Sequence, residues 1–127
     1  IANPPWDKVK PYDQEFFEKI DNKYREYSKT DQKILRDKLL QDTKIKIEYE
    51  KYKLLIKDSI KYYRSKFLLQ GKGGDLNLYK LFLEKGLQIS NNTLNFIIPG
   101  QLTIDKGNFN FRNKFIKEKM LLVSSKR

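Results

Sequence analysis

Apolar residues recur every three or four positions through the first half of the chain, a spacing that is typical of amphipathic helices. The longest stripe predicts a helix over about 45–67 whose apolar face is packing surface, and it comprises Ile45, Tyr49, Tyr52, Ile56, Ile60, Tyr63 and Phe67. A shorter stripe predicts a helix over 13–27, and Thr30 is placed to cap a third helix that ends near Leu40. Residues 13–69 are therefore interpreted as helical.

The pattern changes at the glycines 71, 73 and 74, which are expected to break the long helix. Asp75 is placed to cap a new helix that runs to about Ile89, with Leu78, Phe82, Leu83 and Leu87 on its core-facing side. The apolar run TLNFIIP follows and is closed by Pro99. Such a run is typical of a strand that is buried on both faces of a parallel sheet.

A further helix over about 108–119 and a strand near 121–124 would continue this alternation of elements. Residues 1–12 contain three of the four prolines and are expected to be extended and irregular. Helices that alternate with apolar strands indicate an α/β fold.

Charge is the strongest feature of the composition. The 127 residues, enough for one compact domain, include 27 Lys and Arg against 16 Asp and Glu, a net charge of +11. This excess favours a polyanionic partner such as nucleic acid, through release of counterions from phosphates. Because the lysines alternate with acidic residues, the same numbers also fit an ordinary solvated surface.

Two missing residue types restrict the chemistry. The sequence has no cysteine, which excludes disulfides, thiolate metal sites and cysteine nucleophiles, and no histidine, which excludes an imidazole base or metal ligand. No metal site is therefore expected. No apolar run approaches the roughly 18 residues of a membrane span and no signal-peptide pattern is present, so no membrane partner is expected.

The tetrapeptide Asn3-Pro4-Pro5-Trp6 carries the candidate chemistry. Its prolines make a stiff loop in which the Asn3 side-chain carbonyl and the Pro4 main-chain carbonyl are acceptors. Two acceptors beside the aromatic face of Trp6 suit the exocyclic amino group of a planar base, because hydrogen bonds to both N–H groups stabilise the positive charge that develops on attack. Trp6 would stack on a base turned out of a duplex, although a purely structural turn fits the same residues.

These residues carry a resemblance to a known family. "IANPPW" resembles the (N/D/S)-P-P-(Y/F/W) motif of amino-methyltransferases, and "GDLNLYKLFLEKGLQI…NTLNFIIPGQL" resembles the helix and strand that follow it in gamma-class adenine-specific DNA methyltransferases. The likeness is greatest to the large type IIG restriction–modification enzymes and related phage-defence methylases, in which a charged helical insertion separates the two motifs. It covers 1–27 and 66–120 well and the middle of the chain loosely.

The resemblance implies part of a Rossmann-like, S-adenosylmethionine-dependent methyltransferase domain. In that interpretation residues 1–12 form the target-amine loop, 13–69 a helical insertion, and 70–127 a helix-strand-helix continuation of the α/β core. The implied reaction transfers a methyl group from S-adenosylmethionine to the N6 amino group of a flipped adenine. The implied setting is a restriction–modification or phage-defence system in a prokaryotic cytoplasm, whether or not the parent enzyme is also an endonuclease.

The family's site residues carry over to few positions. Asn3, Pro4 and Trp6 match the catalytic target-amine motif, and Pro5 holds its shape. Phe82 matches the aromatic residue that lies against the adenine ring of S-adenosylmethionine in the family, but it fits a core phenylalanine equally well. The family's cofactor loop lies upstream of the tetrapeptide and its target-recognition domain downstream. Both are missing here, so the chain is expected to be inactive alone and to need these segments and double-stranded DNA as partners.

Two other functions fit the sequence. Protein-glutamine and some RNA methyltransferases share the Asn-Pro-Pro-aromatic motif, and methylation of protein glutamine without methylation of adenine would favour them. The alternative from a different class is a non-catalytic basic module that binds nucleic acid, in which the lysines matter and Trp6 is dispensable. For the methyltransferase interpretation, we expect a basic face of the helical insertion, 13–66, to lie along DNA phosphates.

Overall fold

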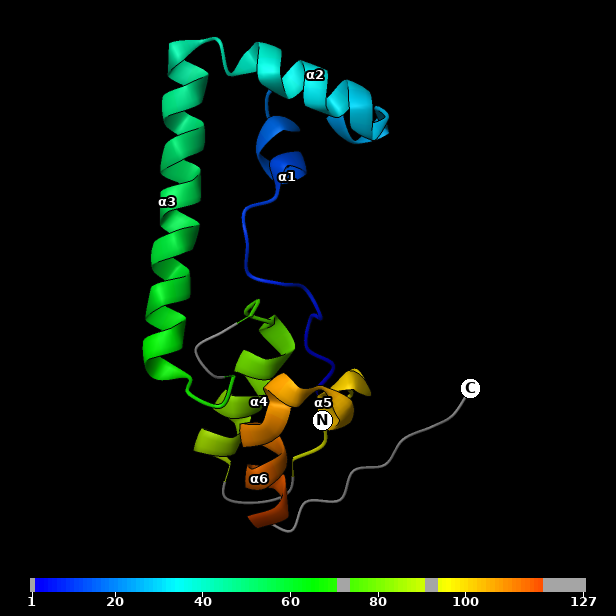
Figure 1. The fold of residues 1–127 in the computed structure, drawn as a ribbon, viewed down its shortest axis with the longest axis vertical. Coiled ribbons are helices and arrows are strands. Elements are labelled where there is room, and N and C mark those ends of the chain that lie inside the picture. The colour runs from blue at the N-terminus through cyan, green and yellow to red at the C-terminus, as the bar shows by residue number, and fades with distance from the viewer. Residues whose placement is uncertain (1, 71–73, 91–93, 118–127) are drawn as a thin grey trace. The chain divides into compact units, whose positions relative to one another are not determined.

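The computed structural model describes residues 2–70, 74–90 and 94–117, without the side chains of residues 115 and 116. Helices dominate the described residues (Figure 1). The α-helices are α1 (Asp13–Phe17), α2 (Lys29–Leu39), α3 (Thr43–Lys66), α4 (Leu78–Ile89), α5 (Gln101–Ile104) and α6 (Phe109–Lys117), and the 3₁₀ turns are η1 (Tyr24–Glu26) and η2 (Lys106–Asn108).

The chain divides into two compact units. The inserted unit comprises residues 10–59, and the terminal unit comprises residues 1–9 together with 60–127. The inserted unit is therefore one continuous stretch between two segments of the other unit.

An aromatic cluster forms the core of the inserted unit. Phe16, Phe17, Tyr24 and Tyr49 are buried in it, and the ring centroid of Phe17 lies 5.1 Å from those of Phe16 and Tyr49 and 5.4 Å from that of Tyr24. Leu35 and other partly buried residues of α2 and α3 pack around the rings. The helix predicted over about 45–67 is confirmed as α3, and the first part of its apolar stripe, Ile45, Tyr49 and Tyr52, packs in this core. The other four positions of the stripe are partly buried.

Two boundaries differ from those predicted. The helix expected over 13–27 ends at Phe17, and a turn follows in which the Asp21 carboxylate accepts a hydrogen bond from the Lys23 N–H at 3.0 Å. Such a local bond competes with the helical pattern. The cap of α2 is Ser28, whose hydroxyl accepts from the Asp31 N–H, so the prediction of Thr30 was wrong by two residues.

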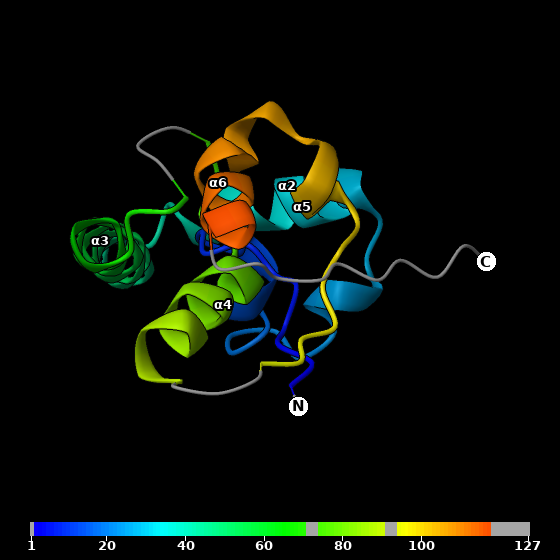
Figure 2. The same cartoon turned by 90° about the horizontal axis from the view of Figure 1, so that it is seen from below.

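A second core holds the terminal unit together. Tyr79 and Leu83 from α4 pack there against Leu102 of α5 and Phe111 of α6, and Figure 2 shows α6 beside α4. The helix predicted to start at Asp75 is confirmed but begins at Leu78, and Asp75 does not cap it. The helix predicted over 108–119 is confirmed as α6 as far as the structure describes it.

The predicted α/β, Rossmann-like fold is wrong. Residues 2–70, 74–90 and 94–117 contain no strand, only two isolated bridges, Ala2 with Phe96 in parallel and Lys8 with Asn77 in antiparallel. The described part of TLNFIIP, 94–99, therefore pairs at a single position and is not the core of a sheet. An apolar run becomes a strand only where neighbouring strands satisfy its backbone, and the other apolar segments here form helices that satisfy theirs internally. The strand predicted near 121–124 lies outside the described residues.

A buried carboxylate joins the end of α3 to α4. Glu84 is only 5% exposed, and its two oxygens accept the backbone N–H groups of Leu68 at 2.7 Å and Leu69 at 3.0 Å. These donors follow the last turn of α3 and have left its helical ladder, so they supply the hydrogen bonds that the buried Glu84 carboxylate needs.

Replacing Glu84 with glutamine is expected to lower the free energy of unfolding by about 1–3 kcal/mol, the usual cost of a buried donor without a partner. A carboxamide has one acceptor oxygen, so one of the two N–H groups would face its NH₂ group. Urea unfolding of Glu84→Gln measures this cost, with the exposed Glu48→Gln on α3 as the control. Equal stability of the two variants would contradict the anchoring role.

Candidate functional site

Backbone hydrogen bonds hold the tetrapeptide Asn3–Trp6 at both ends. Before it, the Ala2 N–H donates to the Asn95 carbonyl at 2.9 Å and the Ala2 carbonyl accepts from the Ile97 N–H at 3.0 Å. After it, the Val9 N–H donates to the Leu76 carbonyl at 2.7 Å, and the Asp7 carbonyl accepts from the Leu78 N–H at 2.9 Å. The four-residue segment is thus fixed between the 95–97 segment and the start of α4.

Within this segment the residues differ in exposure. Pro4 is buried, whereas Asn3, Pro5 and Trp6 are exposed. The Trp6 side chain is 53% exposed, which is high for the largest apolar side chain in a protein. A rigid proline segment therefore presents an aromatic face to solvent.

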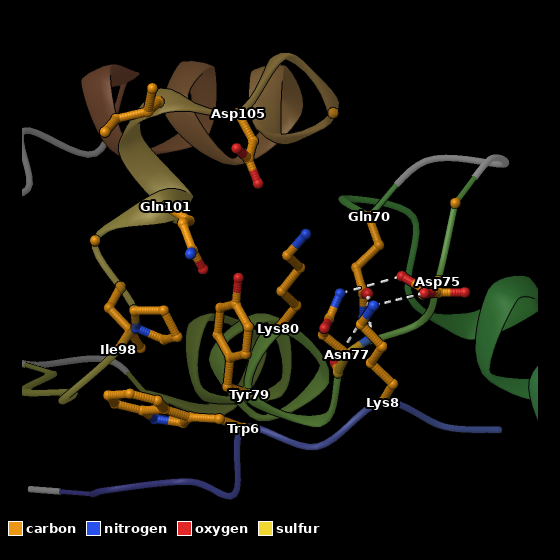
Figure 3. A pocket seen from close by; sticks show the side chains of 15 residues that line it. Trp6, Lys8, Gln70, Asp75, Asn77, Tyr79, Lys80, Ile98, Gln101 and Asp105 are labelled. Carbon is orange, nitrogen blue, oxygen red and sulfur yellow. Dashed lines mark hydrogen bonds and ion pairs between the residues drawn. The ribbon is translucent and has the colours of Figure 1, made fainter. Parts of the chain in front are cut away.

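The exposed face of Trp6 forms part of the wall of a cavity of about 1080 Å³ (Figure 3). Short segments that lie far apart in the sequence line it, all from the terminal unit. They contribute Trp6, Lys8, Gln70, Gly74, Asp75, Asn77, Tyr79, Lys80, Ile98, Pro99, Gly100, Gln101, Ile104, Asp105 and Gly107. The lining combines aromatic and apolar surface with carboxamides, a phenol, lysines and carboxylates, which is the composition of a site for a polar ligand with a flat apolar part.

Three side chains set the electrostatics of the cavity. Burial lowers the pKa of the Lys80 ammonium, and the nearby Asp105 carboxylate opposes this shift. Burial also raises the pKa of the Tyr79 hydroxyl, and Asp105 adds to that shift. In Figure 3 Lys80 and Asp105 extend into the cavity from opposite sides. Because its pKa is raised, the Tyr79 phenol is protonated at neutral pH, so the cavity offers a hydroxyl donor beside the Lys80 side chain.

Three further polar side chains of the lining, those of Gln70, Lys8 and Asp75, are bonded to neighbouring groups. The Gln70 carboxamide is buried and forms both hydrogen bonds of a pair with the Asn77 backbone, accepting from its N–H at 3.0 Å and donating to its carbonyl at 3.3 Å. Lys8 forms an ion pair with Asp75 at 2.8 Å. The first pair of bonds holds the start of α4 against the segment that follows α3, and the ion pair joins the N-terminal segment to the residue three positions before α4.

The structure brings only one of the predicted site residues to the cavity. Trp6 lines the cavity. The three residues that precede Trp6 in the sequence, Asn3, Pro4 and Pro5, do not line it. Phe82 lies on α4, is 51% exposed and is outside both buried clusters, so the alternative of a core phenylalanine is wrong. Phe82 does not line the cavity either, and its contact with the adenine of S-adenosylmethionine stays a prediction.

Sequence reasoning missed the polar wall formed by Tyr79, Lys80, Gln101 and Asp105. The sequence did contain a feature that singles out Lys80. It is the only charged residue between Asp75 and Glu84, in a run that is otherwise mostly apolar. A cation at that place in a helix that packs on a core is a candidate for a site. Gln101 and Asp105 reach the cavity only because α5 folds back over α4, and no local pattern shows this.

The net charge is not spread evenly between the units. The inserted unit has 13 Lys and Arg against 11 Asp and Glu, while the terminal unit has 14 against 5. Most of the positive excess therefore belongs to the unit with the cavity. The helical insertion, which was expected to carry a basic face, has nearly equal numbers of basic and acidic residues.

The close approach of Gly86 on α4 to the Phe96 ring gives a further prediction. A Cβ added at Gly86 on α4 would lie 3.0 Å from two ring atoms of Phe96, the residue that bridges Ala2. Gly86→Ala is expected to displace this ring and loosen the bridge, offsetting the gain of about 1 kcal/mol in helix propensity. Faster hydrogen exchange at the amides of Ala2 and Ile97 would show it.

The control is Gly107→Ala, where an added Cβ meets nothing within 4 Å. This variant is expected to leave exchange at Ala2 and Ile97 unchanged. Unchanged exchange in Gly86→Ala would mean that the ring of Phe96 can yield without disturbing the tetrapeptide.

Two features that the described residues lack bear on the kind of site. No group of three or more acidic, histidine or cysteine side chains suited to a metal ion occurs among them. Within the same residues, no helix combines the length and the apolar character that crossing a bilayer requires.

As far as it is described, the chain is a basic helical protein with a polar cavity beside an exposed tryptophan. Comparisons with protein-family models, curated proteins and solved structures find no match.

Proposed function

We propose that residues 1–127 are part of an S-adenosylmethionine-dependent DNA methyltransferase that modifies the N6 amino group of adenine, with Asn3–Trp6 holding the target base. One observation carries this proposal. The tetrapeptide is fixed at both ends by backbone hydrogen bonds, and its half-exposed Trp6 forms the wall of a cavity large enough for a nucleotide.

The chemistry of the tetrapeptide fits an amino group on a flat ring. Trp6 offers a stacking surface, which contributes about 1–3 kcal/mol for each base that stacks on an aromatic side chain. Asn3 is exposed, so its carbonyl is accessible to a base that lies against Trp6. Two acceptors on the amino nitrogen polarise it as positive charge develops, and their fixed position removes the cost of reorganisation.

The charge of the terminal unit supports DNA as the substrate. Its large excess of Lys and Arg favours binding to phosphates, because binding releases condensed counterions. Duplex DNA presents an adenine to such a site only when the base is extruded, and this costs a few kcal/mol. Stacking on Trp6 offsets part of that cost.

The cofactor is assigned mainly to polypeptide outside residues 1–127. S-adenosylmethionine would supply an activated methyl group, and the predicted contact in this chain is the exposed Phe82. Phe82 itself does not line the cavity, so this chain's part is to bind and orient the base. The proposal rests on the tetrapeptide and the cavity, and it does not require the parallel sheet that the sequence predicted.

The test is to incubate the full-length polypeptide that contains this chain with methyl-labelled S-adenosylmethionine, mixed duplex DNA and a protein extract. Label recovered as N6-methyladenine would support the proposal. Label on protein glutamine or on RNA alone would replace it with the related methyltransferase functions. Salt-sensitive DNA binding with no label on any acceptor would replace it with a non-catalytic nucleic-acid-binding module.

A further inference from the structure

Lys80 is a partly buried lysine of the cavity that forms no direct ion pair with the described residues, although the Asp105 carboxylate is near enough to act on its charge. No carboxylate of the described residues lies within ion-pair distance of its ammonium group, in contrast to Lys8, which pairs with Asp75 at 2.8 Å. The Lys80 ammonium lies over the Tyr79 ring, 5.8 Å from the ring centroid. Burying a charge without a partner costs free energy unless a ligand supplies the partner.

The position of Lys80 relates it to Trp6. Both side chains line the same cavity, Trp6 from the N-terminal segment and Lys80 from the first turns of α4, and Figure 3 shows the ammonium extending into the cavity above the start of the helix. A ligand that fills the space between them meets an aromatic plane at one end and a cation at the other. A nucleotide has this distribution of groups, since its base is flat and its phosphate is anionic.

We propose that Lys80 binds a phosphate of the nucleotide whose base stacks on Trp6. This inference rests on the proposed function for the identity of the base site, but it adds a phosphate contact that the target-amine motif does not contain. Lysine binds phosphate as a compact charge with three donors and without a fixed geometry, so the contact fixes the position of the nucleotide and not its sequence.

Asp105 limits where the phosphate can lie. Its carboxylate faces the cavity from the side opposite Lys80 and would repel an anion placed midway between them. The phosphate therefore lies on the α4 side, and Asp105 is left to accept hydrogen bonds from N–H or O–H groups of the ligand. Such opposed charges also disfavour a ligand bound in the reverse direction.

The experiment uses the single tryptophan of the chain as the probe. Single-stranded adenine-containing oligonucleotides are titrated into the 127-residue chain, and quenching of Trp6 fluorescence gives the affinity at several salt concentrations. Lys80→Gln removes the charge and keeps a similar length. It is expected to weaken binding about tenfold and to reduce the slope of log affinity against log salt by about 0.7, the value for one phosphate contact on a single strand.

Lys85→Gln is the matched control, because Lys85 is an exposed lysine of the same helix that does not line the cavity. Circular dichroism and thermal unfolding confirm that both variants fold. A Lys80→Gln variant that keeps the wild-type affinity and salt slope while Trp6 is still quenched would overturn the phosphate contact and leave the base site standing. No quenching of Trp6 by any oligonucleotide would overturn both.

Discussion

Replacing Asn3 with alanine is expected to lower the rate of methyl transfer to adenine by about 10²–10³-fold in the full-length enzyme, the usual effect of removing one preorganised hydrogen-bonding group. The side-chain carbonyl of Asn3 is the acceptor that alanine removes. Because Asn3 is exposed and its side chain forms no hydrogen bond with the described residues, the loss should fall on the chemical step and not on folding. The rate constant for label transfer under saturating DNA measures it.

Two variants make the result specific to the acceptor. Asn3→Ser keeps an oxygen and belongs to the residues that the family motif accepts, so it should retain part of the activity. Asn95→Ala removes a nearby exposed carboxamide while leaving the backbone carbonyl that accepts from the Ala2 N–H, and it should have little effect. Wild-type rates in Asn3→Ala would place the chemistry outside the tetrapeptide.

The structure explains why the tetrapeptide keeps its place without regular secondary structure. Each proline lacks an N–H group, so the segment cannot join a sheet or a helix through those residues. Its hydrogen bonds are made instead by the flanking residues Ala2, Asp7 and Val9. The sequence predicted a stiff extended loop from the prolines, but the two anchoring segments are distant in the chain and could not be identified from local pattern.

Helices with a clear apolar period were predictable. The stripe on α3 continues over several turns, and a signal of that length needs no tertiary information to be recognised. The start of α4 was harder, because Asp75 is a good capping residue by type but its carboxylate pairs with Lys8 and the helix begins three residues later. Tertiary contacts of this kind override a local capping preference.

The predicted sheet failed for a different reason. A short apolar run does not distinguish a buried strand from an extended segment that packs on a helix. Here Phe96 and Ile98 pack on the α4 core, which gives the run its apolar character. The family resemblance predicted neighbouring strands, and the described residues supply only Ala2 as a partner. The sheet was thus inferred from apolar residues that pack on a helix and not between strands.

Replacing Phe17 with alanine is expected to have the largest effect on stability, a loss of about 3–5 kcal/mol in the free energy of unfolding of the inserted unit. Phe17 is fully buried and lies within 5.4 Å, centroid to centroid, of three aromatic rings. Removing its ring leaves a cavity that the stiff rings around it cannot close. Small domains have a total stability of this order, so the unit should be largely unfolded at 37 °C.

Hydrogen exchange across α2 and the first turns of α3 measures this loss directly. These amides belong to the inserted unit, so they report its opening separately from that of the terminal unit. Ile34→Ala on α2 is the control, since Ile34 is 63% exposed and its loss should change stability by less than about 0.5 kcal/mol. If Phe17→Ala left protection in α2 and α3 close to wild type, the aromatic cluster would not be what holds the inserted unit together. Partial loss with Phe17→Leu, which refills most of the volume, would confirm that packing and not ring chemistry is responsible.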